Sequence, residues 1–212
     1  MIELQLADWR RRVAELYAEV RSAEDPERGH ELWRDGRDAL FRSHPESPLA
    51  ADDPLRETGL PYWPYDPDVR FEVHVISVHE QVRIEVATDN AKTTMRLVGR
   101  VELPDPIGAK VDLWWLEQYG GGLFLPLRDS TAGHETYGGG RYCLDTAKGS
   151  DLGGRGDALI VDFNFLYHPS CRYDPRWVCP LAPAGNTIDL PLRAGEKLCL
   201  DEAKPQDTQT NC

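Results

Sequence analysis

The chain has 212 residues, a length that fits one domain of ordinary size with a substantial hydrophobic core. Hydrophobic residues make up 41% and charged residues 28%, as in globular proteins, and no apolar run is long enough for a membrane span. The formal net charge of -12 argues against a nucleic-acid-binding surface and favours solubility. We expect a cytoplasmic protein with a single domain over residues 1–200 and a disordered polar tail over residues 201–212.

Two amphipathic helices are predicted at the start of the chain. In the first, hydrophobic residues recur at steps of three and four: Leu6, Trp9, Val13, Leu16, Tyr17 and Val20. Pro26 separates it from a second helix, in which Leu32, Trp33, Leu40 and Phe41 share one face. The run HPESPLAADDP ends the second helix, because proline lacks the backbone donor and disfavours helix before it.

From Val69 onward the hydrophobic period changes to two. Val69, Phe71 and Val73 alternate with polar residues, which predicts a half-buried strand. Further strands are predicted over residues 82–86, 95–103, 111–117, 123–127, 141–144, 158–163 and 188–192. Short strands separated by turn-forming residues are typical of an antiparallel sandwich or barrel. The expected class is therefore α+β, a mainly antiparallel β sandwich or barrel with two N-terminal helices covering one face or end.

Two polar motifs dominate the last half of the chain. They are RDSTAGHETYGGGRYCLD and DFNFLYHPSCRYDPRWVCPLAPAGN, and PLRAGEK follows them. With FRSHPESPLA and GLPYWPYDP upstream, these motifs resemble the bacterial and archaeal family called domain of unknown function 1684, over about residues 32–197. The resemblance implies a stand-alone domain and supplies no reaction. His168 stands where the family pattern favours asparagine, so the resemblance gives no support to a role for His168 as a ligand or base.

Glu135, Tyr137 and Arg141 are the candidate catalytic residues. Glu135 would act as acid/base and Tyr137 as hydrogen-bond donor, while Arg141 and Arg128 would hold an anionic group, because guanidinium binds carboxylate or phosphate bidentately. We expect these side chains to converge with Asp162 in one cavity. The alternative is a structural ion pair that ties the loops to the β-body.

Further candidate ligand-binding residues lie on the same loops and strand ends. They are Arg128, Asp129, Asp145, Asp162, Asn164, Tyr167, Cys171, Cys179 and Asn186. Polar groups on loops held by a rigid scaffold are typical of functional sites, but aspartate and asparagine also shape loops by bonding nearby backbone.

Neither a metal nor a cofactor is predicted. The chain has five cysteines, an odd number, and no export signal, so reduced thiols are expected rather than a disulfide framework. The spacing of Cys171 and Cys179 matches no zinc knuckle or ribbon, although a catalytic thiol and simple packing both remain open. The glycine run 138–140 lacks the Lys-Ser ending of a phosphate-binding loop.

These residues favour an enzyme that acts on a small polar or anionic molecule by acid/base catalysis, in a pocket built from the loops of residues 123–186. A ligand-binding module without catalysis and a structural or interaction domain are the alternatives, and the sequence leaves open whether there is catalysis at all. No nucleic-acid or membrane partner is expected.

Overall fold

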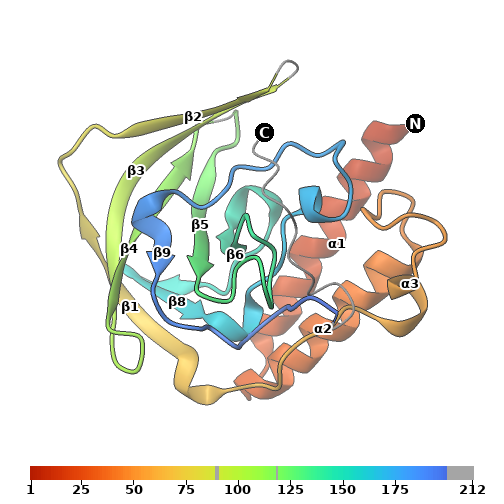
Figure 1. Cartoon of the computed structure of the whole chain (residues 1–212), viewed down its shortest axis with the longest axis horizontal. Helices are drawn as coiled ribbons and strands as arrows, with labels where there is room; N and C mark the ends of the chain where they lie inside the picture. The colour runs from red at the N-terminus through yellow and green to blue at the C-terminus, as the bar shows by residue number, and fades with distance from the viewer. Residues whose placement is uncertain (89–90, 118, 200–212) are drawn as a thin grey trace.

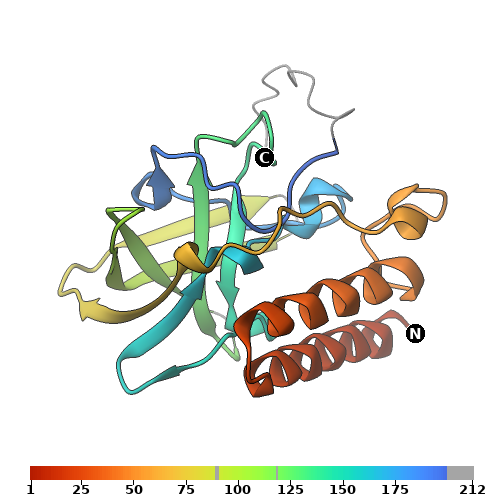
Figure 2. The same ribbon diagram turned by 90° about the horizontal axis from the view of Figure 1, so that it is seen from below.

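The computed structural model describes residues 1–88, 91–117 and 119–199 (Figure 1). Helices α1 (Ile2–Ser22) and α2 (Pro26–Ser43) lie side by side next to a curled, mainly antiparallel sheet (Figures 1 and 2). The predicted α+β class with two N-terminal helices is confirmed. The predicted tail over residues 201–212 lies outside the described residues.

The helical layer forms for local reasons that the sequence contains. The Asp25 side chain caps α2 by accepting a hydrogen bond from the Glu27 backbone N–H, and Pro26 occupies the first helical position. The hydrophobic stripes of α1 and α2 meet around Trp33, whose indole N–H donates to the Tyr17 hydroxyl at 3.0 Å. A short helix, α3 (Leu55–Thr58), follows in the loop that leads to the sheet.

Within the described residues, nine strands make up the sheet. They are β1 (Arg70–Ser77), β2 (Arg83–Thr88), β3 (Ala91–Leu103), β4 (Ala109–Leu116), β5 (Gly122–Asp129), β6 (Arg141–Asp145), β7 (Gly154–Arg155), β8 (Ala158–Asp162) and β9 (Thr187–Ile188). Their order is β6-β5-β4-β3-β1-β8-β7, with β2 beside β3 and β9 parallel to β5. A bridge between Tyr142 and Tyr167 joins β6 to the segment after β8, so the sheet curls into a half-barrel.

The sheet carries hydrophobic clusters on both faces. On β4, Val111 and Leu113 belong to the cluster inside the curl, whereas Trp114 and Leu116 belong to a second cluster. This is the ordinary alternation of a strand, whereas on β3 an irregularity in the register after Leu97 puts Val101 and Leu103 on the face opposite to Met95 and Leu97. The segment around Cys179 packs against the second cluster, so a loop covers the face that the helices leave open.

The structure corrects three details of the predicted strands. The strand expected over residues 188–192 pairs only at Thr187–Ile188, and it does so in parallel. The strand expected over residues 158–163 ends at Asp162, because this side chain accepts the Asn164 N–H and begins the 3-10 turn Phe163–Phe165. The two-residue strand β7 has no periodic signal and was not predicted. In the described part of the chain, no helix is both long and apolar enough to cross a membrane.

Candidate functional site

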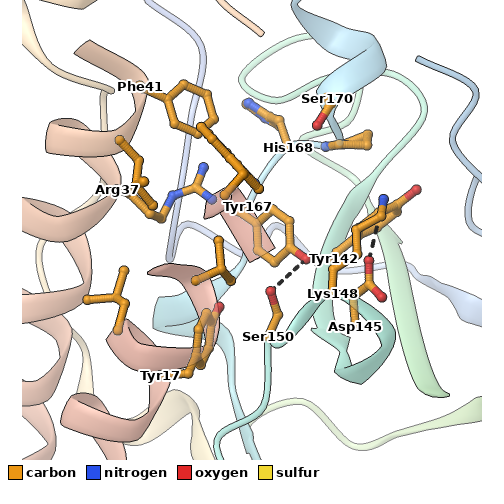
Figure 3. Close-up of a pocket in the computed structure, with 15 residues that line it drawn as sticks. Tyr17, Arg37, Phe41, Tyr142, Asp145, Lys148, Ser150, Tyr167, His168 and Ser170 are labelled. Carbon is orange, nitrogen blue, oxygen red and sulfur yellow. Dashed lines mark hydrogen bonds and ion pairs between the residues drawn. The ribbon is translucent and has the colours of Figure 1, made fainter. Parts of the chain in front are cut away.

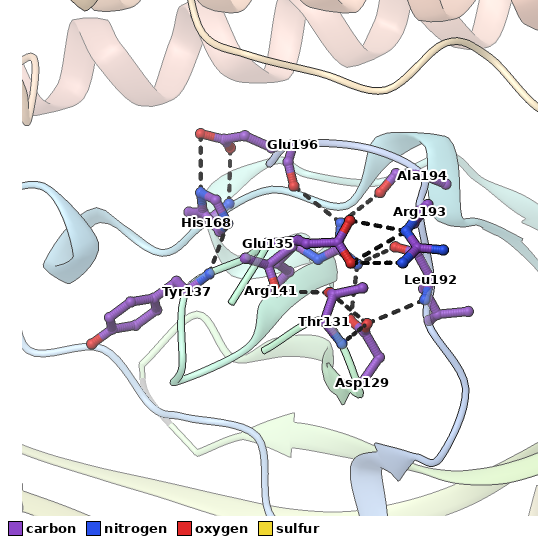
Figure 4. Close-up of polar contacts among 11 residues, drawn as sticks. Asp129, Thr131, Glu135, Tyr137, Arg141, His168, Leu192, Arg193, Ala194 and Glu196 are labelled. Carbon is purple, nitrogen blue, oxygen red and sulfur yellow. Dashed lines mark hydrogen bonds and ion pairs between the residues drawn. The ribbon is translucent and has the colours of Figure 1, made fainter. Parts of the chain in front are cut away.

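Arg141, at the start of β6, lies in a closed polar network rather than at the wall of a cavity (Figure 4). Its side chain is 1% exposed, and one terminal nitrogen lies 2.9 Å from Asp129 Oδ2. The guanidinium also donates to the backbone carbonyls of Leu192, Ala194 and Glu196 at 2.7, 2.5 and 3.0 Å. These bonds use the terminal N–H groups that would otherwise clamp an anionic ligand.

Glu135 lies nearby but at the surface. Its side chain is 41% exposed and its Oε2 atom lies 2.9 Å from the Arg193 guanidinium. Hydrogen bonds from Arg193 favour the carboxylate and lower the pKa of Glu135. The Tyr137 ring points away from Arg141 in Figure 4 and lines a different, mainly apolar cavity. The three predicted catalytic residues therefore do not face one common cavity.

Arg128 and Asp162 lie apart from this network. Arg128 is exposed on β5. Asp162 Oδ1 accepts hydrogen bonds from the backbone and the side-chain amide of Asn164, while Oδ2 lies 3.6 Å from Arg70 Nε. Burial raises the pKa of Asp162 to about 6, and its side chain lines a cavity of about 100 Å³ beside the turn between α1 and α2. The prediction that Arg128 and Asp162 converge with Glu135 is wrong, because β8 carries Asp162 towards the helices.

Three other predicted ligand residues lie around the second hydrophobic cluster. Asn186 is fully buried, accepts a hydrogen bond from the Trp114 indole at 2.9 Å and donates to the Asp112 carbonyl at 2.7 Å. This geometry gives Asn186 a supporting role. Cys171 and Cys179 are both thiols and line the same apolar cavity as Tyr137.

A buried carboxylate that sequence reasoning missed joins the helices to the sheet. Glu196 is fully buried, and its Oε2 atom accepts from Arg37 of α2 at 2.8 Å and from the His168 backbone N–H at 2.9 Å. The Tyr173 hydroxyl and the His168 imidazole face its Oε1 atom. Burial alone would raise the pKa of Glu196, but the charge of Arg37 and the His168 contacts outweigh it and lower the pKa. The only sequence signal was the position of Glu196 in the motif PLRAGEK.

His168 has a defined protonation state in this arrangement. The Tyr137 backbone N–H donates to Nε2 at 3.2 Å, which places the ring proton on Nδ1, towards Glu196. Burial lowers the pKa of His168 despite the neighbouring carboxylate, so the imidazole is neutral at pH 7. His168 thus supports the loop that carries Tyr137.

The strongest candidate site is a cleft between the helices and the turn after β6 (Figure 3). Its inner part is a cavity of about 60 Å³, and an adjoining outer part measures about 320 Å³. Both parts share four lining residues, which are Trp9, Asp145, Lys148 and Ser170. The inner walls are mainly aromatic and include Tyr17, Phe41, Tyr142 and Tyr167. We call this space the Asp145 cleft.

Asp145 places a buried carboxylate in the wall that the two parts of this cleft share. The residue ends β6 and is 1% exposed, and its backbone exchanges two hydrogen bonds of 3.0 Å with Ser150. Its Oδ2 atom lies 3.7 Å from Lys148 Nζ, whereas Oδ1 has no hydrogen-bond partner in the part of the chain that the structure describes. Burial raises the pKa of Asp145, and Lys148 opposes this effect only partly. Tyr167, another predicted ligand residue, lines the same cavity and donates to the Ser150 hydroxyl at 3.0 Å.

A second buried carboxylate lines the outer part of the cleft. Glu46 Oε2 lies 3.5 Å from Arg176 but makes no hydrogen bond. Arg10 of α1 lines the same space and, like Lys148, lowers the pKa of Asp145 by its charge. Glu46 and Lys148 were not among the predicted site residues, although Glu46 lies in the motif FRSHPESPLA.

The Asp145 cleft has the chemistry of a site for a small polar molecule. Two carboxylate oxygens without hydrogen-bond partners call for donors from a ligand or from water, and aromatic walls favour an organic cation. Within residues 1–88, 91–117 and 119–199, no group of three or more His, Cys, Asp or Glu side chains is arranged to hold a metal ion.

Comparisons with known proteins identify the family. The family model described as "Protein of unknown function (DUF1684)" matches residues 57–197. The solution NMR structure of an uncharacterized protein from Haloarcula marismortui is similar, with 32% sequence identity and a TM-score of 0.58, over 79% of this chain and 91% of that chain. No curated protein matches the sequence. The chain therefore belongs to the DUF1684 family, as the motifs in its second half indicate.

Proposed function

We propose that the protein binds a small amine-bearing molecule in the Asp145 cleft. The observation that carries this proposal is Asp145, a buried residue that lines the cleft and whose Oδ1 atom has no hydrogen-bond partner among the described residues. Leaving such an oxygen unsatisfied is costly, and a protonated amine would supply both the donor and the opposite charge. Glu46 offers a second acceptor in the outer part of the cleft, so a molecule with two donor groups fits the arrangement.

The aromatic walls of the cleft support a cation, although Arg10, Lys148 and Arg37 also line the cleft and carry positive charge. Trp9, Phe41 and Tyr167 present aromatic surface, which favours a cation through cation–π attraction. The Arg37 guanidinium already lies over the Phe41 and Tyr167 rings, 5.0 and 4.9 Å from their centroids, so the Trp9 ring is the surface left for a ligand ammonium group. Arg141 was expected to hold an anionic ligand, but its guanidinium is hydrogen-bonded to Asp129 and to backbone carbonyls. Arg37 lines the inner cavity, but it is bonded to Glu196.

A panel of ligands measured by thermal shift and calorimetry tests this proposal. We expect small amines and diamines to raise the melting temperature, since a ligand at one hundred times its Kd stabilises the fold by about 2.7 kcal/mol. Alcohols and carboxylates of the same size serve as the matched panel. Asp145→Asn should weaken amine binding about tenfold or more, because it removes the charge and keeps the shape. The control is Asp157→Asn, an exposed aspartate that pairs with His74.

If no amine shifts the melting temperature, or if Asp145→Asn binds as tightly as the wild type, the proposal fails. Water would then satisfy the Asp145 carboxylate, and the cleft would have only a structural role.

Acid/base catalysis by Asp145 is the second candidate function. The raised pKa of this buried carboxylate favours it, because a general acid or base works best when its pKa lies near the working pH. Glu135 offers less support, since Arg193 lowers its pKa. If a bound amine is converted, Asp145→Asn should lower kcat more than it weakens binding. It should also remove one limb of the pH–rate profile.

A further inference from the structure

The apolar cavity that Tyr137 lines brings Cys171 and Cys179 together, and it shares the lining residues Trp177 and Val178 with the outer part of the Asp145 cleft. It has a volume of about 380 Å³ and lies between strands β2 and β3 and the loop of residues 171–183. Its walls are mainly hydrophobic, and they include Ile84 and Trp177. The cavity has room for a small organic molecule, and the two thiols are the reactive groups in its wall.

The two thiols also contact each other. The Cys171 thiol makes a hydrogen bond to Cys179, and this bond is the main reason why the pKa of Cys179 is lowered. Burial acts in the opposite direction, while the charge of Lys148 and the Tyr142 hydroxyl act with Cys171. Cys179 is therefore a thiol that ionises more readily than an ordinary cysteine. Cys143 is the internal contrast, because burial raises the pKa of its thiol to about 12.

We propose that Cys179 and Cys171 form a peroxide-reducing thiol pair, in which Cys179 attacks a small organic hydroperoxide held in the apolar cavity and Cys171 resolves the product. A nucleophilic thiolate next to a second thiol is the arrangement that converts a transient sulfenic acid into a disulfide. The hydrophobic walls provide a place for the alkyl group of the peroxide.

The reaction balances as follows. The Cys179 thiolate attacks the outer oxygen of the hydroperoxide, the O–O bond breaks, and the alkoxide leaves as an alcohol with the proton that Cys179 had lost. Cys179 is now a sulfenic acid. The Cys171 sulfur then attacks the Cys179 sulfur, a disulfide forms, and the hydroxyl leaves as water with the Cys171 proton. Two molecules of a small thiol then reduce the protein disulfide by exchange: they give their two protons to the cysteines and leave joined as one disulfide.

The sequence allows a direct assay on the full chain. Trypsin cleaves after Arg155, Arg172, Arg176 and Arg193, so Cys171 lies in the peptide 156–172 and Cys179 in the peptide 177–193. Reduced protein is treated at pH 7 with one equivalent of cumene hydroperoxide or of hydrogen peroxide, alkylated, digested and analysed by mass spectrometry. We expect the two peptides to become linked and to separate again after reduction. Cumene hydroperoxide should react about tenfold faster than hydrogen peroxide, since its apolar group is buried in the cavity.

Three variants separate the roles of the thiols. Cys179→Ser should prevent the link and slow peroxide consumption at least tenfold. Cys171→Ser should leave a sulfenic acid on Cys179 that dimedone traps. The matched control is Cys143→Ser, which removes a buried thiol of raised pKa and should react as the wild type does.

Peptide mapping of the oxidised wild-type protein tests the thiol pair even if a variant fails to fold. Absence of the link between the peptides 156–172 and 177–193, or oxidation spread evenly over all five cysteines, would overturn the thiol pair. Equal rates with the two peroxides would overturn the assignment of an organic hydroperoxide to the cavity.

Discussion

Replacing Arg141 by methionine should destabilise the fold strongly without affecting any ligand site. The change removes the positive partner of Asp129 and the donors to the carbonyls of Leu192, Ala194 and Glu196. Breaking a buried ion pair by removing one partner costs about 3–5 kcal/mol, because the remaining charge stays buried without compensation. For a domain of this size, that loss corresponds to a decrease in melting temperature of about 6–20 °C.

Glu135→Gln is the matched comparison, since it removes the charge of an exposed pair. Its partner Arg193 has a side chain that is 58% exposed, so we expect a loss of less than about 1 kcal/mol. Urea unfolding followed by circular dichroism at pH 7 measures both variants. A double variant, Asp129→Leu with Arg141→Met, should recover part of the stability because neither charge of the pair is left buried without its partner. Melting of Arg141→Met within 2 °C of the wild type would refute this account of the network.

Three further predictions concern stability. His30 is buried and its pKa is lowered to about 4, so the unfolded chain takes up the proton first and stability falls as the pH decreases from 6.5 to 4. His30→Phe should remove this pH dependence, which amounts to up to about 3 kcal/mol and is measured by urea unfolding at several pH values. For Asp162 the pKa is raised to about 6, so the folded state holds the proton more tightly and stability falls as the pH rises from 3.8 to 6. At pH 7, Asp162→Asn should therefore be more stable than the wild type by up to about 3 kcal/mol, whereas near pH 3 the two proteins should be equally stable. The same stability difference at both pH values would contradict this. Gly140→Ala should lower the melting temperature more than Gly133→Ala does, because both glycines have positive φ but only the new methyl group at Gly140 meets the Leu127 carbonyl.

Much of the fold could be predicted because its signals are local. The spacing of Leu16, Tyr17 and Val20 defines the buried side of α1 without reference to any other part of the chain. Alternation through Phe71 and Val73 likewise identifies β1. The extent of β9 was not predictable in this way, since its pairing depends on where β5 lies in space.

The candidate site was harder to predict, because burial of a charged residue depends on distant partners. Arg141 and Glu135 are six positions apart in one motif, yet one is enclosed by residues 192–196 and the other is solvent-exposed. The sequence alone does not show where residues 192–196 run in space, and their position determines which of the two side chains is buried. Asp145 and Tyr167 were both among the predicted ligand residues, but their common cavity depends on α1 and α2, which lie more than one hundred positions earlier.

Residues 192–196 also have a consequence for how the protein matures on the ribosome. This segment accepts hydrogen bonds from two arginines of separate layers, since its backbone carbonyls accept from Arg141 of the half-barrel and the Glu196 carboxylate accepts from Arg37 of α2. Both contacts join residues far apart along the chain, and Arg37 and Glu196 are 159 positions apart. A nascent chain that stops short of residue 192 carries both guanidinium groups without these acceptors. The contacts that join the helices to the half-barrel through this segment therefore form only after nearly all of the described chain has been synthesised. Chains truncated before residue 192 should be degraded by proteases more readily than the full chain.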